Sequence, residues 1–176
     1  MRALIDVETA GRGIRRMAGE IVERAGGATN LALVGIRRGG VPLAAKLAAH
    51  IEELENVRVP VGAVDISLYR DDASTALPKP QIGRTELPFD VEGRRIVLVD
   101  DVLYTGRTVR AAVDALLDYG RPQKIQLAVL IDRGGRELPI QPDFVVRVAE
   151  VAANDKVEVL CDETGHRAVV FEGASR

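Results

Sequence analysis

Hydrophobic positions fall into two alternating patterns along most of the chain. Largely apolar runs, which are typical of buried strands, cover residues 31–34, 61–68, 96–99 and 125–131. Apolar residues at helical spacing mark the segments between them, at residues 10–25, 43–51 and 109–117. Strands that alternate with helices are typical of βαβ units. The pattern therefore predicts an α/β fold with a mainly parallel sheet flanked by helices.

Two parts of the chain depart from this alternation. Residues 70–94 combine Pro, Gly and charge with little periodicity, which predicts a long flexible loop. After a short strand near residues 144–148, apolar segments at 157–161 and 168–171 flank a turn, which predicts a small C-terminal hairpin, or hood. Because no linker or repeat interrupts the chain, we expect residues 1–176 to form one domain.

Composition excludes several classes of protein. Apolar residues make up 47% and charged residues 28%, which excludes disordered and fibrous chains. The net charge of −2 means that nucleic-acid binding would need a local basic patch. Cys161 is the only cysteine, and His50 and His166 are far apart, so we expect neither an internal disulfide nor a zinc site. The absence of a signal peptide and of a spanning apolar run predicts a cytoplasmic protein without membrane contact.

Chemistry is concentrated where the strand at residues 96–99 ends. Asp100 and Asp101 follow it directly, and Thr105–Thr108 leads into a helix. Backbone N–H groups and threonine hydroxyls at a helix N-terminus can hold a phosphate, whereas the carboxylates can hold sugar hydroxyls or a hydrated Mg²⁺ ion. This arrangement predicts a site for a phosphorylated ribose, with both carboxylates in an open cleft. The alternative is a simple helix start with Thr105 as its cap and two solvated aspartates.

Three motifs together resemble the PyrR family of type I phosphoribosyltransferases, at residues 67–72, 100–108 and 132–140. Members of this family are pyrimidine-operon regulators and uracil phosphoribosyltransferases. The resemblance implies a reaction of uracil with phosphoribosyl pyrophosphate (PRPP) that gives UMP and pyrophosphate, with Mg²⁺ as the cofactor. It also implies UMP or UTP as an effector and an mRNA leader as a partner. We further expect a homodimer or homotetramer.

The resemblance implies a role for each motif. Asp100 and Asp101 match the acidic pair on the ribose hydroxyls and would act on Mg²⁺ only indirectly, through PRPP and water. Tyr69 and Arg70 match the start of a mobile catalytic flap. Binding of PRPP is implied for thirteen residues: Arg37, Arg38, Gly39, Gly40, Asp100, Asp101, Val102, Leu103, Tyr104, Thr105, Gly106, Arg107 and Thr108.

The same resemblance places the base near the segment that follows residues 125–131. It implies base contacts by Arg133, Arg136 and Val145. Hypoxanthine-type transferases usually have an acid where this chain has Tyr104, so Tyr104 favours a pyrimidine over a purine.

RNA binding is the second implied function. Arg12, Arg15 and Arg16 cluster on the polar side of the first predicted helix, where the alternative is an ordinary solvated face. Gly19 stands where family regulators commonly have a histidine. The segments at residues 37–40 and 146–152 also depart from the family pattern. Two alternatives therefore stay open: a nucleotide-sensing RNA-binding regulator with little or no transferase activity, and a purine phosphoribosyltransferase.

Overall fold

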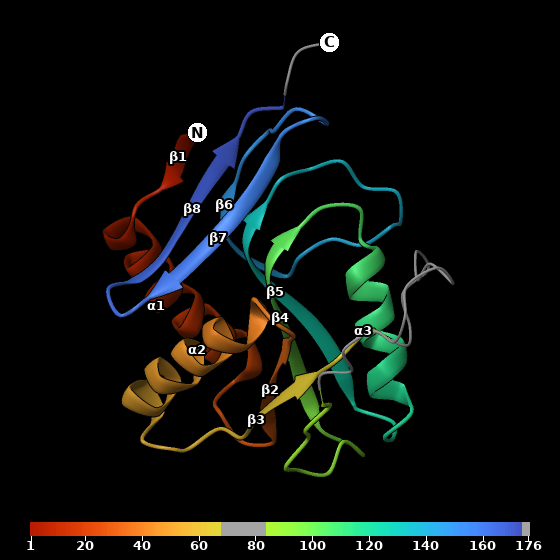
Figure 1. The fold of residues 1–176 in the computed structure, drawn as a ribbon. Coiled ribbons are helices and arrows are strands. Elements are labelled where there is room, and N and C mark those ends of the chain that lie inside the picture. Colours follow the sequence, from red (N-terminus) through yellow and green to blue (C-terminus); the bar gives the residue numbers. More distant parts are fainter. Residues whose placement is uncertain (68–83, 174–176) are drawn as a thin grey trace.

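The computed structural model describes residues 1–67 and 84–173, which form two sheets (Figure 1). The larger sheet is parallel throughout, with the strand order β3-β2-β4-β5-β6. Its strands are β2 (Leu31–Ile36), β3 (Val61–Val64), β4 (Arg95–Leu103), β5 (Lys124–Asp132) and β6 (Phe144–Val148). The smaller sheet is antiparallel, with the order β1-β8-β7. Its strands are β1 (Arg2–Ile5), β7 (Lys156–Asp162) and β8 (Gly165–Phe171).

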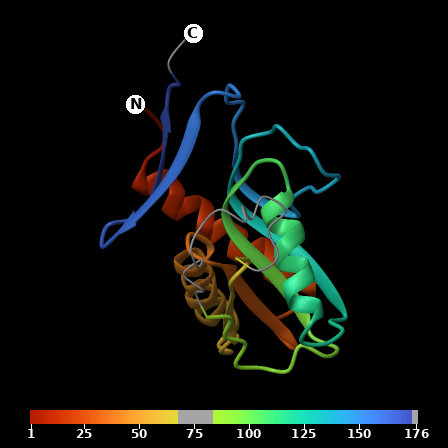
Figure 2. The same ribbon diagram turned by 45° about the vertical axis from the view of Figure 1, so that its right-hand side comes forward.

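Helices bury both faces of the parallel sheet. Helices α1 (Val7–Ala25) and α2 (Gly40–Glu55) cover one face, and α3 (Arg107–Leu117) covers the other (Figure 2). Successive residues of one strand point to opposite faces, so Leu33 joins the core under α1 and α2 whereas Val34 joins the core under α3. Burial on both faces explains the continuous apolar runs of the sequence.

Local signals fix the ends of α1. The Asp6 side chain accepts a hydrogen bond of 2.7 Å from the backbone N–H of Thr9, which satisfies a free donor of the first turn. Gly26 ends the helix in the left-handed conformation, with φ of 69°, which glycine adopts without steric cost. Between these ends, Ile14, Met17 and other apolar residues at helical spacing face the core.

The structure confirms the predicted α/β fold with a parallel sheet, the strand at residues 144–148 and the C-terminal hairpin. The sequence analysis missed β1, because a run of three apolar residues is too short to indicate a strand until β8 supplies its partner. It also ended β4 too early. Hydrogen bonding to β5 continues as far as Leu103, so Asp100 and Asp101 lie inside the strand and not beyond it.

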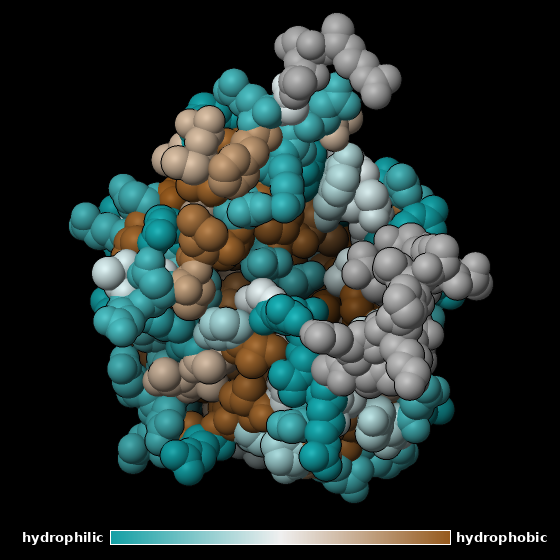
Figure 3. Space-filling view, viewed as in Figure 1, coloured by the Kyte–Doolittle hydropathy of each residue, from teal (hydrophilic) through white to brown (hydrophobic). Residues whose placement is uncertain are grey.

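Other boundaries shift by a few residues, since α1 begins at Val7 and β3 ends at Val64. Most of the predicted flexible loop lies outside the described residues, which resume at Arg84. On the face drawn in Figure 3, hydrophilic residues cover most of the surface and hydrophobic residues show between them. Among the described residues, no helix is long and apolar enough to cross a membrane.

Helix α1 packs unusually closely against β6. A Cβ atom added at Gly13 would lie 2.3 Å from Cγ1 of Val146, whereas one added at Gly19 would meet nothing within 4 Å. We therefore expect Gly13→Ala to lower the free energy of unfolding by about 1–3 kcal/mol through overpacking. Gly19→Ala should raise it by about 0.5–1 kcal/mol, because alanine is the better helix former. Urea denaturation of both variants measures the difference, and an equal gain from both would contradict the close contact.

Candidate functional site

The candidate site lies where β2, β4 and β5 end, with the N-termini of α2 and α3 beside it. The segment before α2 presses against β4. A Cβ atom at Gly39 would lie 2.0 Å from Oδ2 of Asp101, and one at Gly40 would lie 2.0 Å from the carbonyl oxygen of Val99. At Gly40 a Cβ atom would collide with the backbone of β4, and at Gly39 it would displace the Asp101 carboxylate, so the predicted PRPP residues 37–40 lie directly beside the acidic pair. The peptide bond between Arg37 and Arg38 is cis.

The two arginines of this segment differ in their surroundings. The Nε of Arg37 donates to the carbonyl oxygen of Arg84 over 2.7 Å, which turns its guanidinium toward the segment after β3. Arg38 is exposed, and its side chain makes no hydrogen bond or ion pair with the part of the chain that the structure describes. Arg38 is thus the arginine whose charge is available to a ligand.

The two aspartates are not equivalent. Asp100 is only 7% exposed, and its Oδ1 accepts the backbone N–H of Asp101 over 2.9 Å. Burial raises the pKa of the Asp100 carboxyl well above its ordinary value, and the neighbouring Asp101 charge raises it further. The expectation that both carboxylates lie in an open cleft is therefore wrong for Asp100, because β4 continues past it and carries it into the interior. Asp101 is partly exposed, and its Oδ1 accepts the N–H of Val102.

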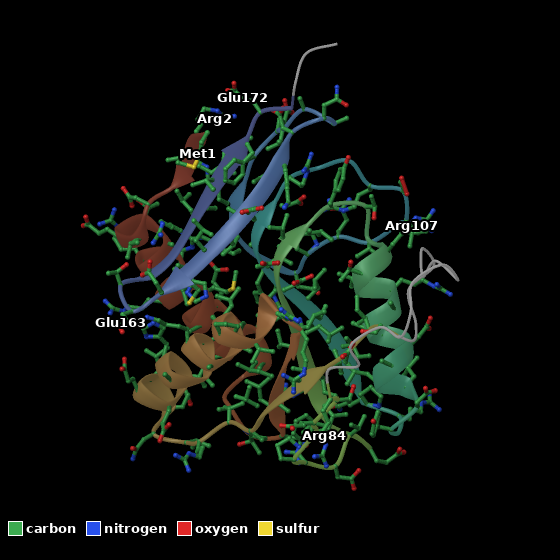
Figure 4. All side chains as sticks on the ribbon, in the orientation of Figure 1. Met1, Arg2, Arg84, Arg107, Glu163 and Glu172 are labelled. Atoms are coloured by element: carbon green, nitrogen blue, oxygen red, sulfur yellow. The ribbon has the colours of Figure 1, made fainter. Side chains whose placement is uncertain are left out.

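The loop between β4 and α3 has the features of an anion site. Gly106 precedes α3 with φ of 92°, a conformation that favours glycine. No side chain caps α3 and its first turn carries no acidic residue, so its N-terminal dipole is not neutralised. The Thr105 hydroxyl accepts the N–H of Arg107 over 3.3 Å, but the cap position itself is Gly106. The side chain of Arg107, labelled in Figure 4, pairs with Glu137 at 2.8 Å.

An ion pair holds the neighbouring loop that follows β5. The Nη2 of Arg136 lies 2.7 Å from Oδ2 of Asp132, and both side chains are largely buried. Arg136 also donates to the carbonyl oxygens of Ile140, over 2.7 Å, and Tyr104, over 3.0 Å. Burial raises the pKa of Asp132, but the hydrogen bonds from Arg136 and from the N–H of Gly134 outweigh it, so the pKa is lowered.

The aromatic ring of Tyr104 lies between these two loops. The guanidinium carbon of Arg133 lies 3.9 Å from the centroid of its ring, a cation–π contact. Arg133 is 7% exposed and donates to the carbonyl oxygens of Ala152 and Asp155. On the same loop as Arg133, Gly135 leaves room for the ring, because a Cβ atom there would lie 2.3 Å from Cε2 of Tyr104.

The predicted base contacts of Arg133, Arg136 and Val145 stay predictions. In the structure both guanidinium groups bind the protein's own carbonyl and carboxylate oxygens, and Val145 packs against the core under α3. Sequence reasoning missed Asp132 as a site-forming residue. Its spacing of four residues from Arg136 was the available signal, but that spacing indicates an ion pair only once the loop conformation is known.

Further predicted residues lie apart from this cluster or outside the described part. Tyr69 and Arg70 lie outside the described residues. On α1, Arg12 pairs with Glu8, and Arg16 pairs with a glutamate and reaches β6 carbonyl groups. Arg15 is exposed and has no such partner in the described ranges.

Comparison with known proteins identifies the relatives of this chain. The model of the phosphoribosyl transferase domain matches residues 3–162. The Bifunctional protein PyrR of Roseiflexus sp. (strain RS-1) is 56% identical over 156 residues, which cover 89% of this chain and 85% of that protein. Its counterpart in Chloroflexus aurantiacus is 52% identical over 99% of this chain and 97% of that protein. The chain belongs to the PyrR family.

Solved structures agree with this PyrR membership at the level of the fold. The hypoxanthine phosphoribosyltransferase of Trypanosoma cruzi superposes with a TM-score of 0.72 at 20% identity, over 99% of this chain and 98% of that protein. The prediction of a type I phosphoribosyltransferase fold is thereby confirmed, and so is the resemblance to the PyrR family. The sheet edge described above is where this PyrR chain brings together its acidic pair, its glycine segment and the start of α3.

The opposite pKa shifts of two buried aspartates in this PyrR chain predict opposite effects of neutralising them. The raised pKa of Asp100 means that the folded state binds its proton more tightly than the unfolded state. Its stabilising contribution is present below the ordinary pKa of 3.8 and is lost as the pH rises through the raised value. We therefore expect Asp100→Asn to stabilise the protein at neutral pH and to have little effect in acid.

Asp132→Asn provides the matched comparison. The lowered pKa of Asp132 contributes stability above its ordinary value and loses it as the pH falls through the lowered one. This variant should lose about 1.5–3 kcal/mol at neutral pH, the usual contribution of hydrogen bonds to charged groups, and less in acid. Denaturant unfolding of both variants between pH 3 and pH 7 measures the two slopes, and slopes of the same sign would contradict the assignment.

Proposed function

We propose that this protein transfers the phosphoribosyl group of PRPP to uracil, which forms UMP and releases pyrophosphate. The observation that carries the proposal is the position of the acidic pair, Asp100 and Asp101, beside the uncapped N-terminus of α3. A ribose phosphate presents two hydroxyls and a dianion in one molecule, so it can occupy both places at once. Relatives that carry the name Bifunctional protein PyrR support the assignment over almost the whole chain.

Each part of the site has a role in this reaction. The partly exposed Asp101 carboxylate accepts hydrogen bonds from the ribose hydroxyls, and the backbone N–H groups of residues 105–108 hold the phosphate ester. Arg38 binds the pyrophosphate as it leaves. The bond from the sugar to pyrophosphate breaks with development of positive charge on the ribose, so positioning and fixed charge lower the barrier and no nucleophilic side chain is required.

The carboxylate oxygen available at this site also fits Mg²⁺, the expected cofactor. The partly exposed carboxylate of Asp101 supplies a hard oxygen that can contact a hydrated Mg²⁺ ion held by PRPP, since Mg²⁺ in proteins usually keeps several waters and is bound together with substrate phosphates. No group of three or more metal-ligating side chains exists among the described residues, so a metal here would need oxygens from the substrate. When bound, Mg²⁺ would neutralise part of the pyrophosphate charge.

Tyr104 supports uracil as the acceptor. Its ring is 37% exposed and is fixed on its other side by Arg133, so it offers one aromatic face to a base. A tyrosine at this place supplies no carboxylate to take a proton from a purine ring. Hypoxanthine-type transferases usually have an acid where this chain has Tyr104, so a purine transferase would lack its expected proton acceptor here.

Asp101→Asn tests the ribose contact. We expect it to lower kcat/KM for PRPP by about tenfold or more, which corresponds to about 1.4 kcal/mol of lost transition-state binding. Asp114→Asn is the control, because Asp114 lies on α3 and pairs at the surface with Arg110. Uracil-dependent release of pyrophosphate by both purified variants is the measurement. Full activity of Asp101→Asn would refute the role, and absence of turnover in the parent protein would favour the regulator alternative.

We propose RNA binding through α1 as the second function, in keeping with the bifunctional relatives. Arg12, Arg15 and Arg16 are exposed and project from successive turns of one helix. Their charge is local, since the chain as a whole carries −2. A pyrimidine-operon leader bound to this face in the presence of UMP would link the nucleotide product to regulation.

Arg15→Ala tests this face, because Arg15 is the arginine without an acidic neighbour among the described contacts. Removing one phosphate contact should weaken leader binding and reduce the slope of log K against log salt by about 0.7 for single-stranded RNA. Arg58→Ala, at an exposed position after α2, is the control. Gel-shift titrations at two salt concentrations with UMP present give both slopes. Equal slopes for Arg15→Ala and the parent, or equal affinity for a scrambled leader, would contradict the proposal.

A further inference from the structure

A cavity of about 260 Å³ lies between α1, α2 and the turn that joins β7 to β8. Figure 4 labels Glu163 at the tip of this turn, on the side of α1 and α2. The ionisable residues that line the cavity come from all three elements: Glu8, Arg12, Arg15, Lys46, His50 and His166. None of them belongs to the transferase site proposed above.

Two buried imidazole nitrogens at this cavity have no hydrogen-bond partner. His166 is 2% exposed, and its Nε2 is buried and unpartnered, while its Nδ1 lies 3.9 Å from Sγ of Cys161. The Nδ1 of His50 is likewise buried and unpartnered, since Oε2 of Glu53 is 3.6 Å away, too far for a hydrogen bond. Buried polar atoms are almost always paired, so two unpaired nitrogens at one cavity point to a polar ligand.

The charge of the lining specifies the kind of ligand. Arg15 and Lys46 make no hydrogen bond or ion pair with the rest of the described chain, and Arg12 pairs with Glu8, the one acidic residue of the lining. Burial lowers the pKa of His166, and the nearby Lys46 ammonium lowers it further, against an opposite effect of Asp101. Two uncompensated cations beside two histidines create a positive field that an anion would neutralise.

We propose that this cavity binds a small oxyanion of the phosphate type, such as inorganic phosphate or a small phosphomonoester. Arg15 and Lys46 supply the charge, and His50 and His166 supply ring N–H donors. The volume lies below the range of about 300–1,000 Å³ that is typical of sites for drug-sized ligands, which suits a phosphate group and leaves no room for a folded RNA. The proposal goes beyond the transferase function, because none of the lining residues is assigned to that site, although Asp101 is near enough to act on the pKa of His166. Two lining residues, Arg12 and Arg15, also belong to the proposed RNA-binding face.

Both histidines of the chain line this cavity, which makes the test direct. NMR signals of the two ring Cε1–H groups report on this cavity, and the His50 signal does so without the effect that Asp101 has on His166. Titration with inorganic phosphate should move both signals along saturable curves with one dissociation constant. Sodium chloride at matched ionic strength should move neither to the same extent. Signals that respond equally to phosphate and chloride would overturn the proposal.

Variants separate a built site from general charge attraction. Lys46 and Arg15 are exposed, so Lys46→Ala and Arg15→Ala should fold, and each should weaken phosphate binding about tenfold or more. Lys124→Ala, at the exposed start of β5, removes the same charge elsewhere and should leave binding unchanged. Equal weakening by Lys124→Ala would overturn the proposal.

Two further experiments identify the ligand and distinguish failure of this proposal from failure of the transferase proposal. A short single-stranded RNA that moves the histidine signals when inorganic phosphate does not would overturn the small-anion site in favour of a nucleic-acid surface. Lys46→Ala should retain uracil-dependent pyrophosphate release. If the parent protein releases no pyrophosphate, the transferase function is refuted. The histidine titration still tests the anion site, because it does not depend on turnover.

Discussion

The ion pair between Asp132 and Arg136 fixes the geometry on which the proposed transferase site depends. Arg136 binds Asp132 at the end of β5 and, at the same time, the carbonyl oxygen of Tyr104 in the loop that follows β4. Backbone N–H groups of Glu137 and Leu138 donate to the carbonyl oxygen of Thr105 and join the same two loops again. The loop between β4 and α3 is thereby held against the loop that follows β5, with the Tyr104 ring between them. Such preorganisation lowers the cost of binding.

Burial of the pair makes this constraint strong. Both side chains are more than four-fifths buried, and removal of one partner from such a pair destabilises a protein because it leaves the other charge without compensation. Asp100 has no such cation among the described residues, and its pKa moves in the opposite direction. One aspartate at this sheet edge is thus kept charged by an arginine, whereas the other is driven toward its neutral form by burial. A neutral Asp100 can donate a hydrogen bond as well as accept one.

Much of this arrangement could be predicted from the sequence, because local patterns determine it. The apolar runs and helical stripes gave the parallel sheet with its helices, and the string from Asp100 to Thr108 gave the acidic pair next to a helix start. Long-range contacts set the features that were missed. β4 extends through Asp101 because β5 pairs with it, and β1 exists because β8 pairs with it. The guanidinium groups of Arg133 and Arg136 are occupied by loop oxygens that no local pattern identifies.

The central claim is that the start of α3 holds the phosphate of a nucleotide whose ribose lies on the acidic pair. A crystal structure of the protein with UMP tests it most directly. The account predicts the phosphate within hydrogen-bond distance of the backbone N–H groups of residues 105–108, with the ribose hydroxyls on Asp101 and the uracil ring beside Tyr104. A phosphate bound elsewhere, with the N–H groups of this loop facing solvent, would contradict the account.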